Sequence, residues 1–234
     1  MSGWIKDWSA GVLACMSFAK HDSATGTVAL QPAPDPFAYR SDVSLRGSMT
    51  ISKPFKPTKQ QLIEAAGQTL PDVIAPNLRV LFCGINPGLY TAAVGHHFAR
   101  PGNRFWPALH KSGFTERLLS PFAERELLKS GIGISNVVPH ATAAAAELTK
   151  EDLVAGGRAL AAKVRRYRPQ IVAILGVGAY RQAFAKPKAQ IGEQTERIHD
   201  APVWVLPNPS GLNANYQLDD LVKLFRELRR AVKK

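Results

Sequence analysis

Two loops of similar sequence carry the side chains best suited to chemistry. Gly84-Ile85-Asn86-Pro87-Gly88 and Pro207-Asn208-Pro209-Ser210-Gly211-Leu212 each hold an Asn-Pro pair followed by a glycine. An asparagine side chain both donates and accepts hydrogen bonds, which suits the edge of a nucleobase. Glycine lets the backbone approach a flat ligand or a phosphate closely. Asn-Pro and Pro-Gly pairs are also common turn punctuation, so for either loop alone a purely structural turn is the simpler interpretation. The occurrence of two such loops is more informative.

A third stretch, residues 91–106, mixes aromatic, histidine and arginine side chains. This mixture is what a stacked base and its phosphates would contact. Phe105 and Trp106 follow helical spacing and fit a hydrophobic core equally well. Adjacent histidines such as His96 and His97 seldom bind one metal ion, and no Cys or acidic residue lies near them at ligand spacing, so we expect no metal and no cofactor. The Gly-x-Gly at residues 176–178 lacks the rest of a phosphate-binding fingerprint.

Alternating helices and apolar strands predict the scaffold that positions these loops. The expected strands are continuous apolar runs, at residues 78–85, 132–138, 171–175 and 202–206. The expected helices are residues 59–66, 103–112, 121–129, 150–167, 179–185 and 218–232. The pattern predicts an α/β fold of three layers, with a short, mainly parallel central sheet between helices. Ligands bind beyond the carboxyl ends of such strands, so both Asn-Pro loops should lie on one edge of the sheet.

Composition limits the classes of function. The 234 residues are 45% hydrophobic, which is enough for one sizeable folded domain. Lys and Arg total 30 against 18 Asp and Glu, and the net charge of +12 favours polyanionic partners such as nucleic acid. Two cysteines exclude a disulfide framework, and no apolar run reaches the roughly 18 residues of a membrane span. We therefore expect a cytoplasmic protein.

Residues 1–48 differ from the rest. They contain four basic and four acidic residues, no Glu and no sustained helical or strand pattern, so the whole charge excess lies in residues 49–234. We expect residues 1–48 to be a flexible or mis-annotated extension, and residues 49–234 to form the catalytic domain.

The three motifs, in this order, resemble the mismatch-specific uracil-DNA glycosylases and the related thymine-DNA glycosylases, within the uracil-DNA glycosylase superfamily. The matching runs are Gly84–Gly88, Gly95–Trp106 and Asn208–Leu212, with Gly156-Gly157-Arg158 as further support. The resemblance covers about residues 75–232. It implies base-excision repair in the bacterial cytoplasm: a monofunctional glycosylase flips uracil out of DNA, hydrolyses its N-glycosidic bond and leaves an abasic site. Whether uracil, thymine or ethenocytosine is preferred stays open.

The resemblance also implies roles for the base pocket. Asn86 would position the hydrolytic water, Phe98 would stack on the flipped base and Asn208 would contact the flipped nucleotide. The other implied base-pocket positions are Ile85, Gly88, Thr91 and His97.

On the DNA side, Leu212 would act as a wedge that fills the vacated stack. The implied DNA contacts around it are Ser210, Gly211 and Asn213. The implied partner is double-stranded DNA with a G·U or G·T mismatch, bound by a monomer. The alternatives are a non-catalytic module on the same fold that binds mismatched or single-stranded DNA, and a hydrolase that acts on a free nucleotide.

Overall fold

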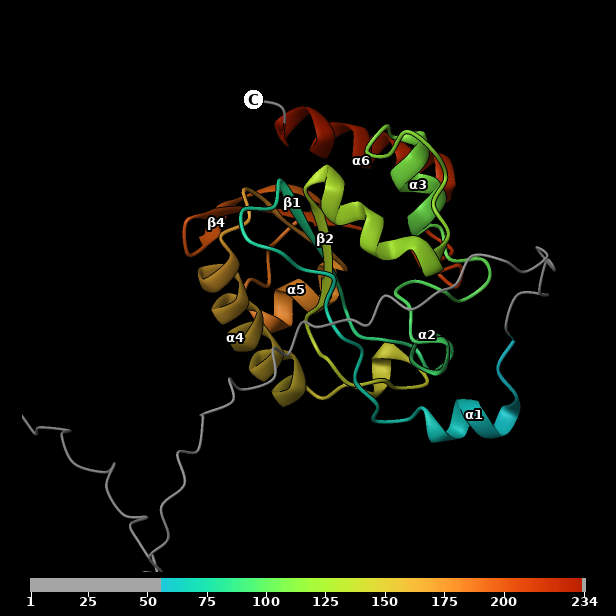
Figure 1. Ribbon diagram of the computed structural model, residues 1–234. Helices are drawn as coiled ribbons and strands as arrows, with labels where there is room; N and C mark the ends of the chain where they lie inside the picture. Colours follow the sequence, from blue (N-terminus) through green and yellow to red (C-terminus); the bar gives the residue numbers. More distant parts are fainter. Residues whose placement is uncertain (1–55, 233–234) are drawn as a thin grey trace, which may run out of the picture. The chain divides into compact units, whose positions relative to one another are not determined.

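The computed structural model describes residues 56–232 (Figure 1). In chain order the elements are α1 (Lys59–Glu64), β1 (Val80–Gly84), α2 (Leu89–Val94), α3 (Phe105–Lys111), the 3-10 helix η1 (Pro121–Ser130), β2 (Ile132–Asn136), the 3-10 turn η2 (Ala145–Glu147), α4 (Lys150–Tyr167), β3 (Val172–Leu175), α5 (Val177–Ala183), β4 (Gly192–Ile198), β5 (Ala201–Leu206) and α6 (Leu218–Val232). No helix within residues 56–232 is long and apolar enough to cross a bilayer. The expected extension, residues 1–48, lies outside the described part, so that expectation stays a prediction.

The described residues form one five-stranded sheet with the strand order β2-β1-β3-β5-β4. β1 pairs in parallel with both β2 and β3, and β3 pairs in parallel with β5. β4 runs antiparallel to β5 at the edge. The predicted α/β class with a short, mainly parallel sheet is confirmed. The carboxyl ends of β1, β2, β3 and β5 therefore lie on one edge.

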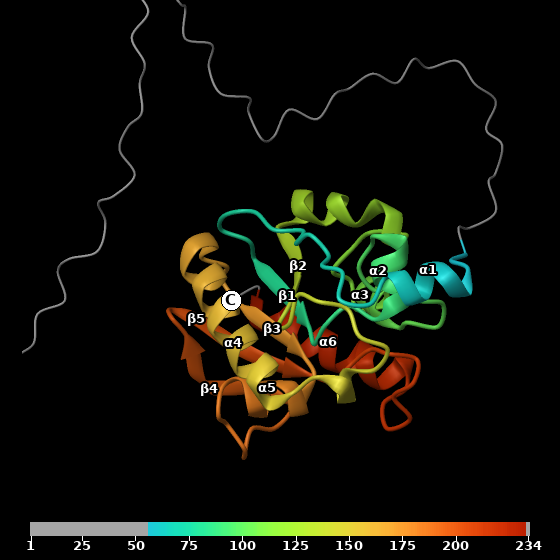
Figure 2. The same cartoon turned by 90° about the horizontal axis from the view of Figure 1, so that it is seen from below.

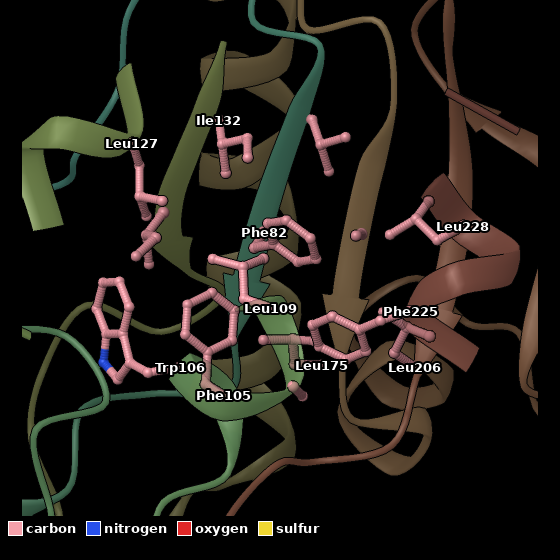
Figure 3. Packing of buried hydrophobic residues seen from close by; sticks show 14 of the residues in the cluster. Phe82, Phe105, Trp106, Leu109, Leu127, Ile132, Leu175, Leu206, Phe225 and Leu228 are labelled. Atoms are coloured by element: carbon pink, nitrogen blue, oxygen red, sulfur yellow. The ribbon is translucent and has the colours of Figure 1, made fainter. Parts of the chain in front are cut away.

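Alternate residues of the central strands bury their side chains on opposite faces of the sheet. Val80 and Phe82 join one hydrophobic cluster with α3, α6 and η1, whereas Leu81 and Cys83 join a second with α4 and α5. Figures 1 and 2 show the sheet between these two helical layers. Phe82 is the centre of the first cluster, with Phe105 and Phe225 rings 5.5 and 5.6 Å from its own (Figure 3). Phe105 and Trp106 are thus core residues, and buried Cys83 has a raised pKa because burial disfavours the thiolate.

Most predicted elements are present with slightly shifted ends. The helix predicted at 150–167 has those bounds, and the Thr149 hydroxyl caps it by accepting a hydrogen bond from the Asp152 N–H at 3.0 Å. Residues 121–130 form a 3-10 helix instead of the expected α-helix, and this helix is kinked at Ala123, whose φ of −102° and ψ of 17° are non-helical. Neither α2 nor β4 was expected. β4 is an edge strand of polar, partly exposed residues, which has no apolar run to reveal it.

Two glycines of α4 bring that helix into backbone contact with its neighbours. A Cβ on Gly156 would lie 2.4 Å from the Val137 carbonyl oxygen, just after β2. A Cβ on Gly157 would lie 2.5 Å from the Ala183 carbonyl oxygen at the end of α5. Neither position has room for a side chain, since the opposing atoms are backbone. The close contact at Gly156 therefore holds the segment that follows β2 against α4.

We predict that Gly157→Ala destabilises the protein by about 1–3 kcal/mol, because the added methyl overpacks the α4–α5 contact. Without that contact the same change would stabilise a helix by up to about 1 kcal/mol. Gly178→Ala in α5 is the matched control: a Cβ there meets nothing within 4 Å, so unchanged or slightly raised stability is expected. Urea denaturation measures both. Equal effects of the two substitutions would contradict the close contact.

Candidate active site

A cleft of about 360 Å³ opens at the carboxyl edge of the parallel strands. Asn86, from the loop after β1, and Leu212, from the loop after β5, both line it. The other lining residues are Gly84, Ile85, Pro87, Gly88, Thr91, His97, Phe98, Arg100, Asn103, Asn136, Thr142, Ala143, Ala144, Ala145, Asn208, Ser210 and Asn213. Its volume is in the usual range for a small-molecule or nucleotide pocket. The two loops that sequence analysis paired therefore meet in one cavity.

The Asn86 side chain is held in one orientation. Its Nδ2 amide donates to the Thr142 hydroxyl at 2.8 Å, to the Pro87 carbonyl at 3.1 Å and to the His140 carbonyl at 3.3 Å. Carbonyl oxygens only accept hydrogen bonds, so the NH₂ group must face them. The Thr142 hydroxyl in turn donates to the Ala144 carbonyl at 2.8 Å, which leaves its oxygen to accept from Asn86. The carbonyl oxygen of Asn86, which uses none of these bonds, is the group left for a ligand or a water.

Thr142 reaches Asn86 because the chain after β2 follows the chain after β1. The Val137 and Val138 amides donate to the carbonyls of Gly84 and Ile85, both at 2.9 Å. The Thr142 amide then donates to Pro87 at 3.2 Å. Beyond this bridge, three exposed alanines, 143–145, form one wall of the cleft. The β1–β2 pairing thus continues as hydrogen bonds between two loops that line the cleft.

Asn136, the last residue of β2, has a side chain at the floor of the cleft. Its side-chain Oδ1 lies only 2.5 Å from where a Cβ on Gly84 would be. The residue is 6% exposed, and its side-chain amide has no hydrogen-bond partner among residues 56–232. Among the described residues only Trp204 Nε1 is a fully buried side-chain N or O atom without a partner, so the Asn136 amide is still accessible from the cleft and can hydrogen-bond a ligand or water there. Asn136 is therefore a candidate ligand-binding residue that sequence analysis missed.

Phe98 lies beside Asn136 in a strained backbone conformation. Its φ is +54°, in the left-handed region that non-glycine residues rarely adopt. Its ring stacks on Phe105, with centroids 4.1 Å apart, and its edge lies 3.4 Å from a Cβ built on Gly84. Phe98 is half-buried and lines the cleft. With one face packed on Phe105, the ring has its other face for a flat ligand.

A buried carboxylate holds the segment that leads to Phe98. Glu124 accepts a hydrogen bond from the His97 backbone amide at 2.7 Å and contacts His96 Nδ1 at 3.0 Å. The Trp106 indole N–H donates to the His97 carbonyl at 3.2 Å. These bonds fix the backbone on both sides of the His97 peptide. They explain how the strained conformation at Phe98 is maintained.

The His97 ring is buried, and its surroundings favour the neutral form. Its pKa lies below the usual 6.5 because burial disfavours the charged ring, although the nearby Glu124 carboxylate opposes this effect. Its Nε2 lies 3.1 Å from the Pro71 carbonyl, which can only accept, so Nε2 carries the hydrogen. The neutral ring then has a bare Nδ1, which can accept a hydrogen bond.

The loop after β5 is ordered by its own side chains. The Asn208 Oδ1 accepts from the Ser210 amide at 3.0 Å, so Asn208 retains its NH₂ donors for a ligand. The Asn213 side chain donates to the Asn208 carbonyl at 2.9 Å, and the Leu212 amide donates to the Ser210 hydroxyl at 3.3 Å. Leu212 itself is 74% exposed. The loop therefore presents a large apolar side chain to solvent at the rim of the cleft.

The cleft carries little charge. Among the described residues that line it, only Arg100 has a formal charge, and Arg100 forms no ion pair within that part of the chain. No group of three metal-ligating side chains is found in residues 56–232. The site can therefore offer amide hydrogen bonds, an aromatic face and one arginine to a ligand.

Comparison with known proteins identifies the family. The sequence matches the uracil DNA glycosylase superfamily over residues 71–232. The chain belongs to this superfamily. Its structure also resembles the solution NMR structure of a candidate uracil DNA glycosylase from Methanosarcina acetivorans, with a TM-score of 0.51 and 16% identity. That match covers 72% of this chain and 99% of the archaeal one, and it confirms the uracil-DNA glycosylase-like fold.

In this glycosylase-superfamily chain, the cleft contains every predicted site residue except Gly211. Gly211 instead packs on backbone: a Cβ there would lie 2.6 Å from the Gly102 carbonyl oxygen. Gly176, part of the incomplete phosphate loop, packs against the Ile85 side chain. Asn136 and Thr142 were missed, although a polar residue that ends an apolar strand is a usable signal for Asn136.

We predict that His97 makes the glycosylase domain acid-sensitive. Below about pH 6.5 the unfolded chain binds a proton at this histidine more readily than the folded chain does, so the free energy of unfolding decreases as pH falls. His97→Gln retains an N–H donor for Pro71 but cannot titrate. Urea denaturation at about pH 7.5 and pH 5.5 should show a smaller acid loss for this variant than for the wild type. Exposed His199→Gln is the control. Identical pH dependence of wild type and His97→Gln would contradict the assignment.

Proposed function

We propose that this protein is a monofunctional DNA glycosylase that extrudes uracil from G·U mismatches and hydrolyses its N-glycosidic bond. The observation that carries the proposal is the meeting of Asn86 and Leu212 in one cleft. The first can orient a water at an extruded nucleotide, and the second can occupy the gap left in the duplex. Either feature alone has a structural explanation, whereas the pair fits an enzyme that acts on a flipped base.

In this proposal Asn86 orients the water through its carbonyl oxygen. The three hydrogen bonds of Nδ2 hold that oxygen in place, so the binding position of the water is preorganised. A neutral amide is a poor base, and no Asp or Glu of the described chain lines the cleft. Catalysis then depends mainly on stabilising the departing base as an anion, and turnover is slow. No lysine of the described chain lines the cleft either, which supports hydrolysis without a Schiff base and without strand cutting.

The base pocket combines stacking with polar contacts. Phe98 offers an aromatic face, and the free Asn136 amide offers both a donor and an acceptor to the base edge. Thr91 and His97 also line the pocket, and in this proposal a thymine methyl or a larger damaged base would lie against them. Backbone groups of Ile85 and Gly88 belong to this pocket in the proposal. Thymine and ethenocytosine are therefore secondary substrates to test beside uracil.

Extrusion requires DNA contacts beyond the base. Unstacking a nucleotide costs a few kcal/mol and is easiest at a mismatch, which favours G·U and G·T over A·U before any pocket contact. Leu212 is suited to the vacated stack because it is apolar and already exposed. Asn208 retains amide donors for the flipped nucleotide, with Ser210 and Asn213 in the same loop. Arg100 lines the cleft and forms no ion pair within residues 56–232, so it suits a neighbouring phosphate.

We predict that the wild type releases uracil fastest from G·U duplexes, more slowly from A·U, and leaves intact abasic strands. Asn86→Ala should reduce release by about a hundredfold, because the water loses its orientation, while DNA affinity stays within about threefold. Thr142→Val removes the hydroxyl that accepts from Asn86 and donates to the Ala144 carbonyl, and it should reduce release by about tenfold. Single-turnover assays on G·U, G·T, A·U and single-stranded uracil measure these rates. Wild-type release by Asn86→Ala would contradict the role of Asn86.

We predict that Leu212→Ala slows excision from duplexes by about tenfold and leaves excision from single strands almost unchanged, since a single strand has no stack to refill. Leu118→Ala is the matched control, because Leu118 is also exposed and does not line the cleft. Comparing the duplex and single-strand rates of both variants tests the wedge. Equal losses on the two substrates would exclude this role.

One observation favours a second candidate. The absence of a carboxylate from the described lining suits a module that binds extruded or single-stranded bases without chemistry. Such a module would bind uracil-containing mismatches and release no base under single-turnover conditions. The same assay therefore separates the two functions.

A further inference from the structure

Arg104 connects the segment that carries Phe98 to the loop that carries Leu212. It stands at the N-cap of α3, immediately after residues 95–103, which include Phe98. Its guanidinium donates from Nη1 to the carbonyls of Asn213, at 3.0 Å, and Tyr216, and from Nη2 to the carbonyl of Gly211 at 3.2 Å. The Arg104 side chain thus donates to the backbone carbonyls of both chain neighbours of the exposed Leu212 and to a third carbonyl four residues after it.

The backbone of the same segment also meets this loop. The Arg104 amide donates to the Pro209 carbonyl at 2.9 Å. Gly211 lies against Gly102, so closely that a Cβ would be 2.6 Å from the Gly102 carbonyl oxygen. The two segments are far apart in sequence and yet share four hydrogen bonds and a backbone contact. No other described arginine bonds three carbonyls of a single loop.

The chemistry of arginine fits this task. Residues 207–217 form neither helix nor strand, so their carbonyls lack regular partners. The rigid guanidinium fork can bond several carbonyls at once, and hydrogen bonds from a charged donor are stronger than neutral ones. Arg104 has no carboxylate partner in residues 56–232. Its charge is directed to the loop and remains close to the side from which DNA would approach.

We propose that Arg104 is a positioning residue that sets the Leu212 wedge relative to the base pocket. With Arg104 in place, residues 95–104 and the loop of residues 207–217 form one rigid unit. Insertion of Leu212 into the duplex then places the extruded base against Phe98. Without it, Leu212 remains but its loop samples other conformations, so duplex opening and base capture lose their common geometry. The inference rests on the proposed function, because it assigns Arg104 to base extrusion.

Three variants test this inference. Arg104→Met removes all three guanidinium bonds while keeping an unbranched apolar stem, and Arg104→Lys keeps the charge but cannot span three carbonyls. Arg226→Met is the matched control, because Arg226 donates from Nη2 to the Lys111 carbonyl at 3.1 Å, away from the cleft. Thermal unfolding confirms that each variant is folded. Arg104→Lys serves if Arg104→Met does not fold.

Single-turnover rates on G·U duplexes and on single-stranded uracil are then compared, alone and combined with Leu212→Ala. We expect Arg104→Met to slow duplex excision by about tenfold or more, to change single-strand excision by less than about twofold, and to add nothing in the Leu212→Ala background. Arg104→Lys should restore part of the duplex rate. Equal losses on both substrates, additive losses with Leu212→Ala, or wild-type rates would each overturn the inference.

Hydrogen exchange of the amides in residues 210–216 supplies a readout that needs no activity. Arg104→Met should lose protection there, whereas Arg226→Met should match the wild type. Unchanged protection in Arg104→Met overturns the inference even if the wild type excises uracil. If instead the wild type releases no base from any substrate, the proposed glycosylase function fails while the exchange result still decides whether Arg104 orders the loop.

Discussion

The shared direction of β1, β2, β3 and β5 is the constraint on which the site depends. Parallel strands must all end at the same edge, so the loops that follow them are neighbours although they lie far apart in sequence. Asn86 follows β1, Asn136 ends β2 and Asn208 follows β5. These three asparagines therefore line one cleft, each from a position at or just after the end of its own strand. The antiparallel β4 contributes no residue to that cleft and closes the far edge of the sheet.

Internal hydrogen bonds decide which atoms remain for a ligand. The nitrogen of Asn86 is used by Pro87, His140 and Thr142, and its oxygen remains; for Asn208 the reverse holds, because its oxygen accepts from Ser210. Asn136 keeps both. The same residue type therefore presents an acceptor, a donor or both, according to its neighbours. Such preorganised dipoles are effective where charge develops on a departing group.

Local sequence patterns predicted the scaffold well, because buried parallel strands are continuous apolar runs and long helices carry caps. The helix from Lys150 to Tyr167 and the convergence of the two Asn-Pro loops followed from such patterns. α2 was missed because six residues without a side-chain cap give little signal, and β4 because an exposed edge strand is polar. The importance of Thr142 and Glu124 could not be predicted, since each acts through a residue at least 27 positions away. Only the folded chain brings such partners together.

The wall made by alanines 143–145 has a consequence for how this pocket could diversify. These residues line the cleft and are exposed, so they contribute almost nothing to the hydrophobic core. Thr142, one position earlier, bonds Asn86 and donates to the backbone carbonyl of Ala144, so the alanine side chains take no part in these hydrogen bonds. Exchanging them for larger or polar residues would reshape the space offered to a ligand while the hydrophobic core and the hydrogen bonds of the Asn86 amide stayed intact. Substitutions in this short segment would therefore change which ligands the pocket accepts with little effect on the stability of the fold.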